Sequence, residues 1–212
     1  ELDPNYATAH QWLGNDSLVS YGRFDEAIAE GKRAVELDPL SSIINADLGI
    51  TLGLARRYDE AIQQFKKTIA IDPTFFYAHY NLGIVLQLKG DLSGAIAEYQ
   101  KAKDLSDDSF TIALLGAGKA LAGDKSAAQQ TLKELDRISQ NQAVDEYSRA
   151  LLFLSMNDKE EALRSVAKAV AQRDGSSLTW IKVDPLLDPL RGDARFEAFV
   201  QKVIAPKAET KH

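Results

Sequence analysis

A pattern that returns about every 34 residues constrains this chain more than any other feature of its sequence. Small residues mark five copies, at Gly14, Gly49, Gly83, Gly116 and Ala150, with steps of 35, 34, 33 and 34 residues. Further small residues follow each marker after a short turn. A period of this length is typical of stacked pairs of helices, and such an array usually works by presenting a surface.

Each copy predicts two amphipathic helices joined by a tight turn. In the third copy, Leu82, Val85 and Leu86 have the spacing of one helix face. Gly90 and Asp91 then supply the turn. Two helices that cross after so short a turn leave no room for a large side chain at the crossing point. Because glycine in a helix costs roughly 1 kcal/mol, its repeated use indicates a packing constraint.

The second and third copies resemble the tetratricopeptide repeat (TPR), in which Leu-Gly is followed by an aromatic residue or Leu, then Gly, Ala, an aromatic residue, Ala and Pro. The second copy carries Leu48-Gly49, Phe65 and Pro73 at these places. The resemblance covers residues 5–172, and it implies an all-α fold, a right-handed α-solenoid of about five helix–turn–helix repeats with a C-terminal helical cap. We expect the repeats near residues 7–41, 42–75, 76–108, 109–142 and 143–172.

Two departures from the pattern occur in the first copy. One additional residue stands between Gly14 and Gly22, which predicts a bulge or a longer turn. Gly31 stands where an aromatic side chain normally fills the core. We expect a gap there, or room for a neighbouring side chain such as Trp12.

The two ends of the chain lie outside the period. Residues 1–4 repeat the Leu-Asp-Pro or Ile-Asp-Pro endings at 37–39 and 71–73, so we expect them to be the tail of a missing preceding repeat and the chain to be a fragment. We expect a capping segment over residues 173–206 and a disordered tail over 207–212.

The capping segment contains apolar residues that can cover the last repeat, since an array needs a terminal element over its apolar face. The candidates for this cover are Trp180, Leu186, Leu187 and Phe196. The alternating charges of the segment predict surface ion pairs, which involve Asp184, Asp188, Arg191, Asp193 and Arg195.

The string from Leu178 to Phe199 also resembles the end of TPR regions at the C-terminus of bacterial multidomain signalling proteins, such as winged-helix regulators, serine/threonine kinases and nucleotide cyclases. This resemblance implies a sensory or scaffolding module whose effector domain lies upstream. Structural capping is the simpler interpretation of the same residues.

Composition excludes several classes of function. The 212 residues carry a formal net charge of −6 and no dominant basic patch, so a nucleic-acid partner is not expected. No apolar stretch approaches the roughly 18 residues of a membrane span, so no membrane partner is expected either. The absence of cysteine excludes disulfides and thiolate metal sites. The cytoplasm is the expected compartment, with the periplasm as the alternative.

No arrangement of residues indicates catalysis, a cofactor or a metal ion. Residues 116–120 resemble the end of a phosphate-binding loop, but Ala113 replaces its first glycine and Ala120 replaces the Ser or Thr that holds magnesium. His10 and His79 occupy nearly the same repeat position and lack a second ligand at the spacing of a metal site. We therefore expect a protein that is not an enzyme.

The resemblance to TPR proteins implies that a partner binds the concave wall, which the first helices of the repeats line. The family's contact positions give an unusually apolar candidate groove in this chain. Its residues are Gln11, Asn15, Ile43, Ile50, Leu54, Tyr77, Tyr80, Ile84, Gln87, Phe110 and Tyr147. The alternative is that several of them pack against the next repeat.

The same mapping excludes the carboxylate clamp of Lys, Asn and Arg that chaperone-binding members of the family use. The matching positions hold Gln11, Asn15, Asp47, Tyr77 and Asn81, of which only Asn15 fits. We therefore expect a protein or peptide partner with apolar anchors. Tyrosines suit such a site because they offer contact area and a polar tip.

Two other functions are consistent with the same sequence. One is a structural arm that mediates homo-oligomerisation, with its apolar end or groove docking a second copy. The other is a small-molecule sensor with a pocket inside the superhelix.

Overall fold

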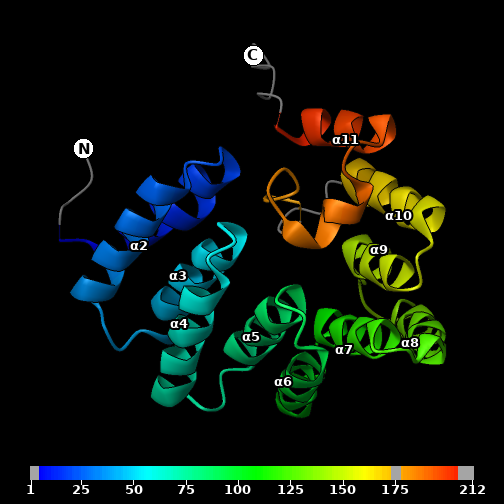
Figure 1. Cartoon of the computed structure of the whole chain (residues 1–212), viewed down its shortest axis with the longest axis horizontal. Coiled ribbons are helices and arrows are strands. Elements are labelled where there is room, and N and C mark those ends of the chain that lie inside the picture. The colour runs from blue at the N-terminus through cyan, green and yellow to red at the C-terminus, as the bar shows by residue number, and fades with distance from the viewer. Residues whose placement is uncertain (1–4, 173–177, 205–212) are drawn as a thin grey trace.

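The computed structural model describes residues 5–172 and 178–204, and over these residues the protein consists of helices and the turns that connect them, without strands. Helices come in consecutive pairs, each packed on its neighbours in sequence, so that the chain forms an open arc (Figure 1). The pairs are α1 (Ala7–Trp12) and η1 (Leu13–Leu18) with α2 (Phe24–Leu37), α3 (Ser42–Leu54) with α4 (Tyr58–Ile71), α5 (Phe76–Leu88) with α6 (Leu92–Leu105), α7 (Ser109–Leu121) with α8 (Lys125–Ile138), and α9 (Glu146–Ser155) with α10 (Lys159–Gln172). The predicted all-α solenoid is confirmed.

Some expectations concern residues outside the described part of the chain. These are the missing repeat at residues 1–4, the part of the cap at 173–177 and 205–206, and the disordered tail at 207–212. Within the described part, no helix is both long and apolar enough to cross a membrane.

The small residues stand where the two helices of a pair come closest. A Cβ atom added to Gly83 on α5 would lie 2.5 Å from the Cε1 atom of Tyr99 on α6. One added to Gly49 on α3 would lie 2.7 Å from Cε1 of Phe65 on α4. Both rings are fully buried. Because no larger residue fits without moving a buried ring, the glycine period is a packing requirement.

Each turn inside a pair contains one residue with a positive φ. Glycine fills this position in three turns, as Gly22, Gly90 and Gly123, with φ between 76° and 112°. Arg56 and Asn157 fill it in the other two, with φ of 61° and 63°. This left-handed region costs an ordinary residue roughly 1–2 kcal/mol, so another requirement must explain an arginine at position 56.

The additional residue of the first copy lies inside its first helix. η1 is a stretch of π-helix that continues α1 and leads into the turn at Gly22. A π-helical bulge accommodates one residue more than an α-helix in the same length. The predicted bulge is therefore confirmed, and it is located in the helix rather than in the turn.

The space beside Gly31 on α2 is filled, but by a different residue from the one expected. The three atoms nearest to an added Cβ all belong to Leu48 on α3, the closest at 3.1 Å. Trp12 is instead 60% exposed. Room for a neighbouring side chain is confirmed and the choice of Trp12 is wrong, because the next pair supplies the apolar contact.

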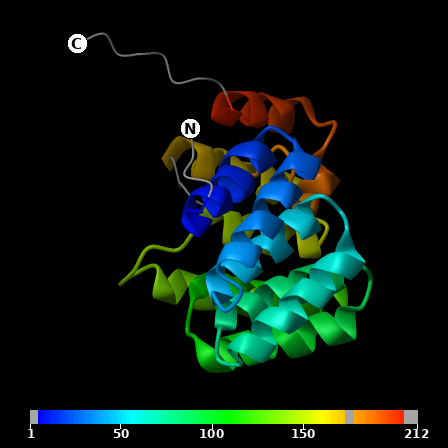
Figure 2. The ribbon, with the colours of Figure 1, turned by 90° about the vertical axis from the view of Figure 1, so that its left-hand side faces the viewer.

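After the last pair, the chain turns back across the inside of the arc. Residues 178–190, called here the C-terminal segment, lie between the two arms of the arc and end in the 3₁₀-helix η2 (Pro185–Leu190) (Figure 1). The final helix α11 (Ala194–Ile204) then packs over α10 (Figures 1 and 2).

The expected cap on the last repeat is present in the second half of this region. Leu187 and Phe196 are fully buried and share one core cluster with Val166 and Ala169 of α10. Leu186 is partly buried against the same cluster. These residues therefore cover the apolar face that the last pair would otherwise expose.

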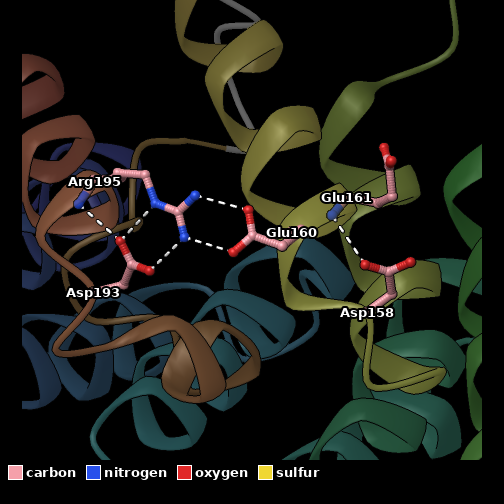
Figure 3. Close-up of polar contacts among 5 residues, drawn as sticks. All are labelled: Asp158, Glu160, Glu161, Asp193 and Arg195. Atoms are coloured by element: carbon pink, nitrogen blue, oxygen red, sulfur yellow. Dashed lines mark hydrogen bonds and ion pairs between the residues drawn. The ribbon is translucent and has the colours of Figure 1, made fainter.

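Ion pairs fix the start of α11 to α10. The guanidinium of Arg195 donates to both carboxylate oxygens of Glu160, each at 2.8 Å, and it also pairs with Asp193 (Figure 3). Arg191 pairs with Asp188 at 2.8 Å. These contacts confirm four of the five expected charged partners, which orient the turns at the surface.

Candidate functional site

The concave side of the arc holds a cavity of about 510 Å³. Its inner wall comes from the first helices of four successive pairs, α3, α5, α7 and α9. Its other wall is the C-terminal segment, which is drawn in orange inside the arc in Figure 1. The candidate site is thus formed by both parts of the chain.

Most of the residues expected in the groove line this cavity. They are Ile50, Leu54, Tyr77, Tyr80, Ile84, Phe110 and Tyr147. They come from four helices that are far apart in the sequence, and the stacking of the pairs brings them to one surface.

Gln11 and Asn15 are buried in a polar joint between the first two pairs instead. The side-chain amide of Gln11 donates to Asp47 at 2.6 Å, and Asn15 accepts from the hydroxyl of Thr51 at 3.4 Å. Burial raises the pKa of Asp47 to about 6, although the hydrogen bond from Gln11 acts in the opposite direction. These two residues hold the array together and do not line the cavity.

Gln87 and Ile43 also lie outside the cavity lining. Gln87 accepts a hydrogen bond from the hydroxyl of Tyr99 at 3.0 Å, so it satisfies a buried phenol of the same pair. Ile43 is 44% exposed at the start of α3. The family's contact positions therefore carry over to this chain only in part.

A row of aromatic rings runs along the inner wall from α5 to α9. Ring centroids of Tyr77 and Tyr80 are 5.1 Å apart, and those of Tyr80 and Phe110 are 5.5 Å apart, both edge to face. Phe110 and Tyr147 follow at 6.0 Å. Edge-to-face pairs are a favourable arrangement. The rings therefore pack against the next repeat and also line the cavity. The two interpretations of the sequence, a binding groove and packing between repeats, both apply to them.

Trp180 lies against the first pair of helices, at the opposite end of the array from the repeat that it was expected to cover. Its indole Nε1 donates to the backbone carbonyl of Asn15 at 3.1 Å, within η1. Its ring packs against the buried cluster that contains Leu18 and Val19. The prediction for Trp180 is wrong, because the C-terminal segment crosses the arc before α11 returns to the last pair.

A second long-range contact holds the same crossing. Asp188 in η2 pairs with Arg56 at 2.7 Å. Arg56 is one of the two non-glycine residues with a positive φ in the turns. The ion pair with the C-terminal segment is a contact that a glycine at this position could not make.

Asp184 is not the surface residue that its charge pattern predicts. Its carboxylate accepts hydrogen bonds from the hydroxyl of Tyr147 and from the backbone N–H of Leu186. Burial raises the pKa of Asp184, and these hydrogen bonds lower it in part. The residue is partly buried because it joins the C-terminal segment to α9.

Two further acidic residues of the lining were missed by the sequence analysis. Asp108 and Asp145 line the cavity and are the N-caps of α7 and α9, where they accept from the backbone N–H groups of Thr111 and Tyr147. Aspartate is a preferred N-cap. The available signal was an aspartate directly before an inner-wall helix.

The histidines of the repeat position have structural partners. The buried His79 contacts Glu98 at 2.7 Å and the carbonyl of Pro73 at 3.1 Å. His10 contacts Glu30 in the first pair. Both contacts join the two helices of a pair. Among the described residues, no group of three His, Asp or Glu side chains is arranged to hold a metal ion.

The fold and its inner cavity define an α-solenoid that presents a concave surface. Residues 57–90 match a family model of the TPR repeat, and residues 76–109 match a second model of the tetratricopeptide repeat. No curated protein is similar enough to match the chain. The chain therefore contains tetratricopeptide repeats, as the sequence pattern predicts.

Several solved structures share this fold. A thermophilic TPR protein of Thermus thermophilus is 22% identical with a TM-score of 0.60, over 86% of this chain and 99% of that one. PilW, a widely conserved type IV pilus biogenesis factor, is 24% identical with a TM-score of 0.57, over 85% and 84%. YrrB, a TPR protein with an unusual peptide-binding site, is 22% identical with a TM-score of 0.51, over 84% and 91%.

Proposed function

We propose that this protein is a non-catalytic interaction module that holds a segment of a protein partner in its concave cavity. The observation that supports the proposal is the cavity of about 510 Å³ between four successive pairs and the C-terminal segment. This volume lies within the roughly 300–1,000 Å³ that is usual for binding sites. TPR proteins are generally scaffolds, and a scaffold role fits such a site.

The lining favours a partner with apolar anchors. Ile50, Leu54 and Ile84 supply aliphatic surface, while Tyr77 and Tyr80 add aromatic surface with hydroxyl groups. Desolvated pockets of this kind concentrate the binding energy of an interface. Because these side chains lie on helices of a packed array, little conformational entropy of the protein is lost when a partner binds. YrrB, which shares the fold, has a peptide-binding site, so a peptide is the first partner to test.

Selection from a phage-displayed peptide library tests this proposal. We expect the wild type to enrich peptides with apolar anchors, and the Tyr80→Ala, Ile84→Ala double variant to bind them at least about tenfold more weakly. Tyr21→Ala is the matched control, since Tyr21 is 73% exposed and lies outside the cavity lining. Equal affinity for a double variant with native circular dichroism contradicts the proposed site.

Self-association is a second candidate, which the first helix supports. Trp12 is 60% exposed, whereas the residues at the same repeat position in three later copies, Asp47, Leu114 and Ser148, are buried. A second copy that docks on α1 would cover Trp12. Sedimentation over a wide range of concentrations tests this: we expect a dimer that Trp12→Ser dissociates. A monomer at the highest concentration contradicts it.

The wider setting that we propose is a bacterial signalling or regulatory protein in the cytoplasm. It is supported by the resemblance of residues 178–199 to the ends of such proteins. Sequencing the gene upstream of the codon for Glu1 tests the proposal. We expect an output domain there, and an upstream sequence without one contradicts it.

A further inference from the structure

The C-terminal segment is built into the last pair of helices. Ile181, Leu187 and Leu190 are almost completely buried, in one core cluster with residues of α9 and α10. Asp184 accepts a hydrogen bond from the hydroxyl of Tyr147 on α9. Because burial of apolar surface is the main favourable term in folding, the segment and the last pair form one unit.

The contacts of the segment with the first two pairs are more exposed. Trp180 donates one hydrogen bond to the carbonyl of Asn15, and its half-buried ring packs on the cluster of the first pair. Asp188 forms an ion pair with Arg56, whose side chain is 51% exposed. Exposed ion pairs add little to stability. These four residues are called the clasp here, and they are the weaker of the two attachments.

Both residues that the array contributes to the clasp depart from the regular repeat. Asn15 lies in the π-helix η1, after which the N–H of Val19 donates to the carbonyl of Gly14, five residues earlier. Arg56 has a φ of 61°, in the left-handed region that an ordinary residue adopts at a cost. π-Helical bulges and strained backbone both occur often at functional sites. Their coincidence at the clasp indicates that this joint has a role beyond packing.

The curvature of the array decides how far apart the two walls of the cavity lie. The pairs of the array pack mainly on their neighbours in sequence. Small rotations at successive contacts therefore add up over the arc. One wall of the cavity is the array and the other is the C-terminal segment, which belongs to the last pair. A change in curvature separates these walls unless the clasp holds them together.

We propose that the clasp is a conformational device that holds the arc closed around the cavity and opens for a partner. It opens at Trp180 and Asp188, while the C-terminal segment stays on the last pair. A partner segment enters the open form, and it contacts both walls in the closed form. Because a ligand favours the state in which it makes more contacts, partner binding and clasp closure stabilise each other. This coupling rests on the proposed peptide-binding function, whereas the clasp itself does not.

The distance between the two arms of the arc reports the state of the clasp. The chain has no cysteine, so Lys32→Cys on α2 and Lys168→Cys on α10 place two spin labels and no others. Both positions are exposed, and their helices lie on opposite arms (Figure 1). By double electron–electron resonance we expect one distance population in the labelled protein. Arg56→Ala with Trp180→Ala, called the release variant, should add a population at longer distance.

A matched control replaces the same residue types outside the clasp. It is Arg57→Ala with Trp12→Ala, because Arg57 pairs with Glu60 in its own pair of helices and Trp12 is 60% exposed. A release variant with the same distances as this control overturns the clasp. If the release variant loses its native circular dichroism, Arg56→Ala with Trp180→Phe takes its place, since phenylalanine keeps an apolar ring without the indole donor. Unchanged distances in that variant overturn the clasp equally.

Hydrogen exchange of the wild type tests the coupling to a partner. The probe is a peptide enriched in the phage-display selection. No residue of η1 lines the cavity, so a peptide in the cavity does not cover this helix. We expect exchange in η1 to become slower when the peptide binds, because closure of the clasp holds Trp180 on Asn15. Exchange in α8, which is outside both the lining and the clasp, should not change. Peptide binding that leaves exchange in η1 unchanged overturns the coupling.

The two experiments separate this inference from the proposed function. Enriched peptides that depend on Tyr80 and Ile84, together with unchanged arm distances in the release variant, overturn the clasp and leave the function standing. If no peptide is enriched, the function and the coupling fail together, and the spin-label distances alone decide whether the clasp holds the arc closed.

Discussion

The repeat array and the C-terminal segment are held in place by different kinds of contact. In the array, helices pack on their neighbours in sequence, as at the crossing of Gly83 and Tyr99. The C-terminal segment packs on the last pair through Ile181, Leu187 and Leu190, and it also makes single contacts over long distances in the chain. Trp180 reaches Asn15 over 165 residues, and Asp188 reaches Arg56 over 132 residues.

This difference explains how the candidate site is formed. The array supplies one wall by regular stacking, and an array of this kind leaves a groove on its concave side. The C-terminal segment, which has no repeat, adds a second wall to the groove, and the result is a half-open cavity. The shape of the site therefore depends on its least regular part, and variants in the two parts should have separable effects.

The largest effect is expected in the array, at Tyr99. Its ring is fully buried against Gly83 and its hydroxyl donates to Gln87. We expect Tyr99→Ala to lower the free energy of unfolding by about 3–5 kcal/mol, measured by urea denaturation. The exposed Tyr21→Ala should change it by less than about 0.5 kcal/mol. A loss at Tyr99 as small as that at Tyr21 would show that the crossing contacts do not stabilise the array.

The polar joint between the first two pairs should show a pH-dependent effect. Because the pKa of Asp47 is about 6 in the folded state against an ordinary 3.8, its proton favours folding at low pH and this stability is lost as pH rises towards 6. We expect Asp47→Asn to raise the free energy of unfolding by up to about 3 kcal/mol at pH 7, and hardly at all near pH 4. The measurement is urea denaturation across this pH range. A gain in the free energy of unfolding that is independent of pH contradicts the raised pKa of Asp47.

A smaller and more local effect is expected in the C-terminal segment, at Trp180. Trp180→Ala removes the apolar contacts of a half-buried indole and one hydrogen bond. We therefore expect the free energy of unfolding to fall by about 2 kcal/mol. Hydrogen exchange should show weaker protection in α1 and η1 and little change in α10. Weaker protection in α10 with none lost in η1 would place the indole against the last repeat instead. Trp12→Ala is the control for an exposed indole.

The smallest effect on stability is expected at Arg56, where a stabilising ion pair and a destabilising positive φ oppose each other. Arg56→Ala removes an exposed ion pair, so we expect the free energy of unfolding, measured by urea denaturation, to fall by less than about 1 kcal/mol. Arg56→Gly loses the same pair but relieves the positive φ, so we expect it to be about 1 kcal/mol more stable than the alanine variant. Two variants of equal stability contradict the assignment of backbone strain to this turn.

The sequence predicted the array well because its determinants are local and repeated. Gly49, Gly83 and the residues that they contact recur in phase, so the helix pairs followed from spacing. The contact positions of the TPR family supplied the eleven groove residues, and seven of these line the cavity. The position of Trp180 did not follow, because no periodic pattern relates it to Asn15. Asp184 was misplaced for the same reason, since its partner Tyr147 belongs to another part of the chain.

The most direct test of this account is whether Trp180 contacts the first pair of helices in solution. In a nuclear Overhauser spectrum of the Trp12→Phe variant, the remaining indole belongs to Trp180, and the cluster on which it packs contains Leu18 and Val19. We predict cross-peaks between this indole and the methyl groups of Leu18 or Val19. Cross-peaks to Val166 and Val170 of α10, with none to the first pair, would contradict the position of the C-terminal segment as the second wall of the cavity.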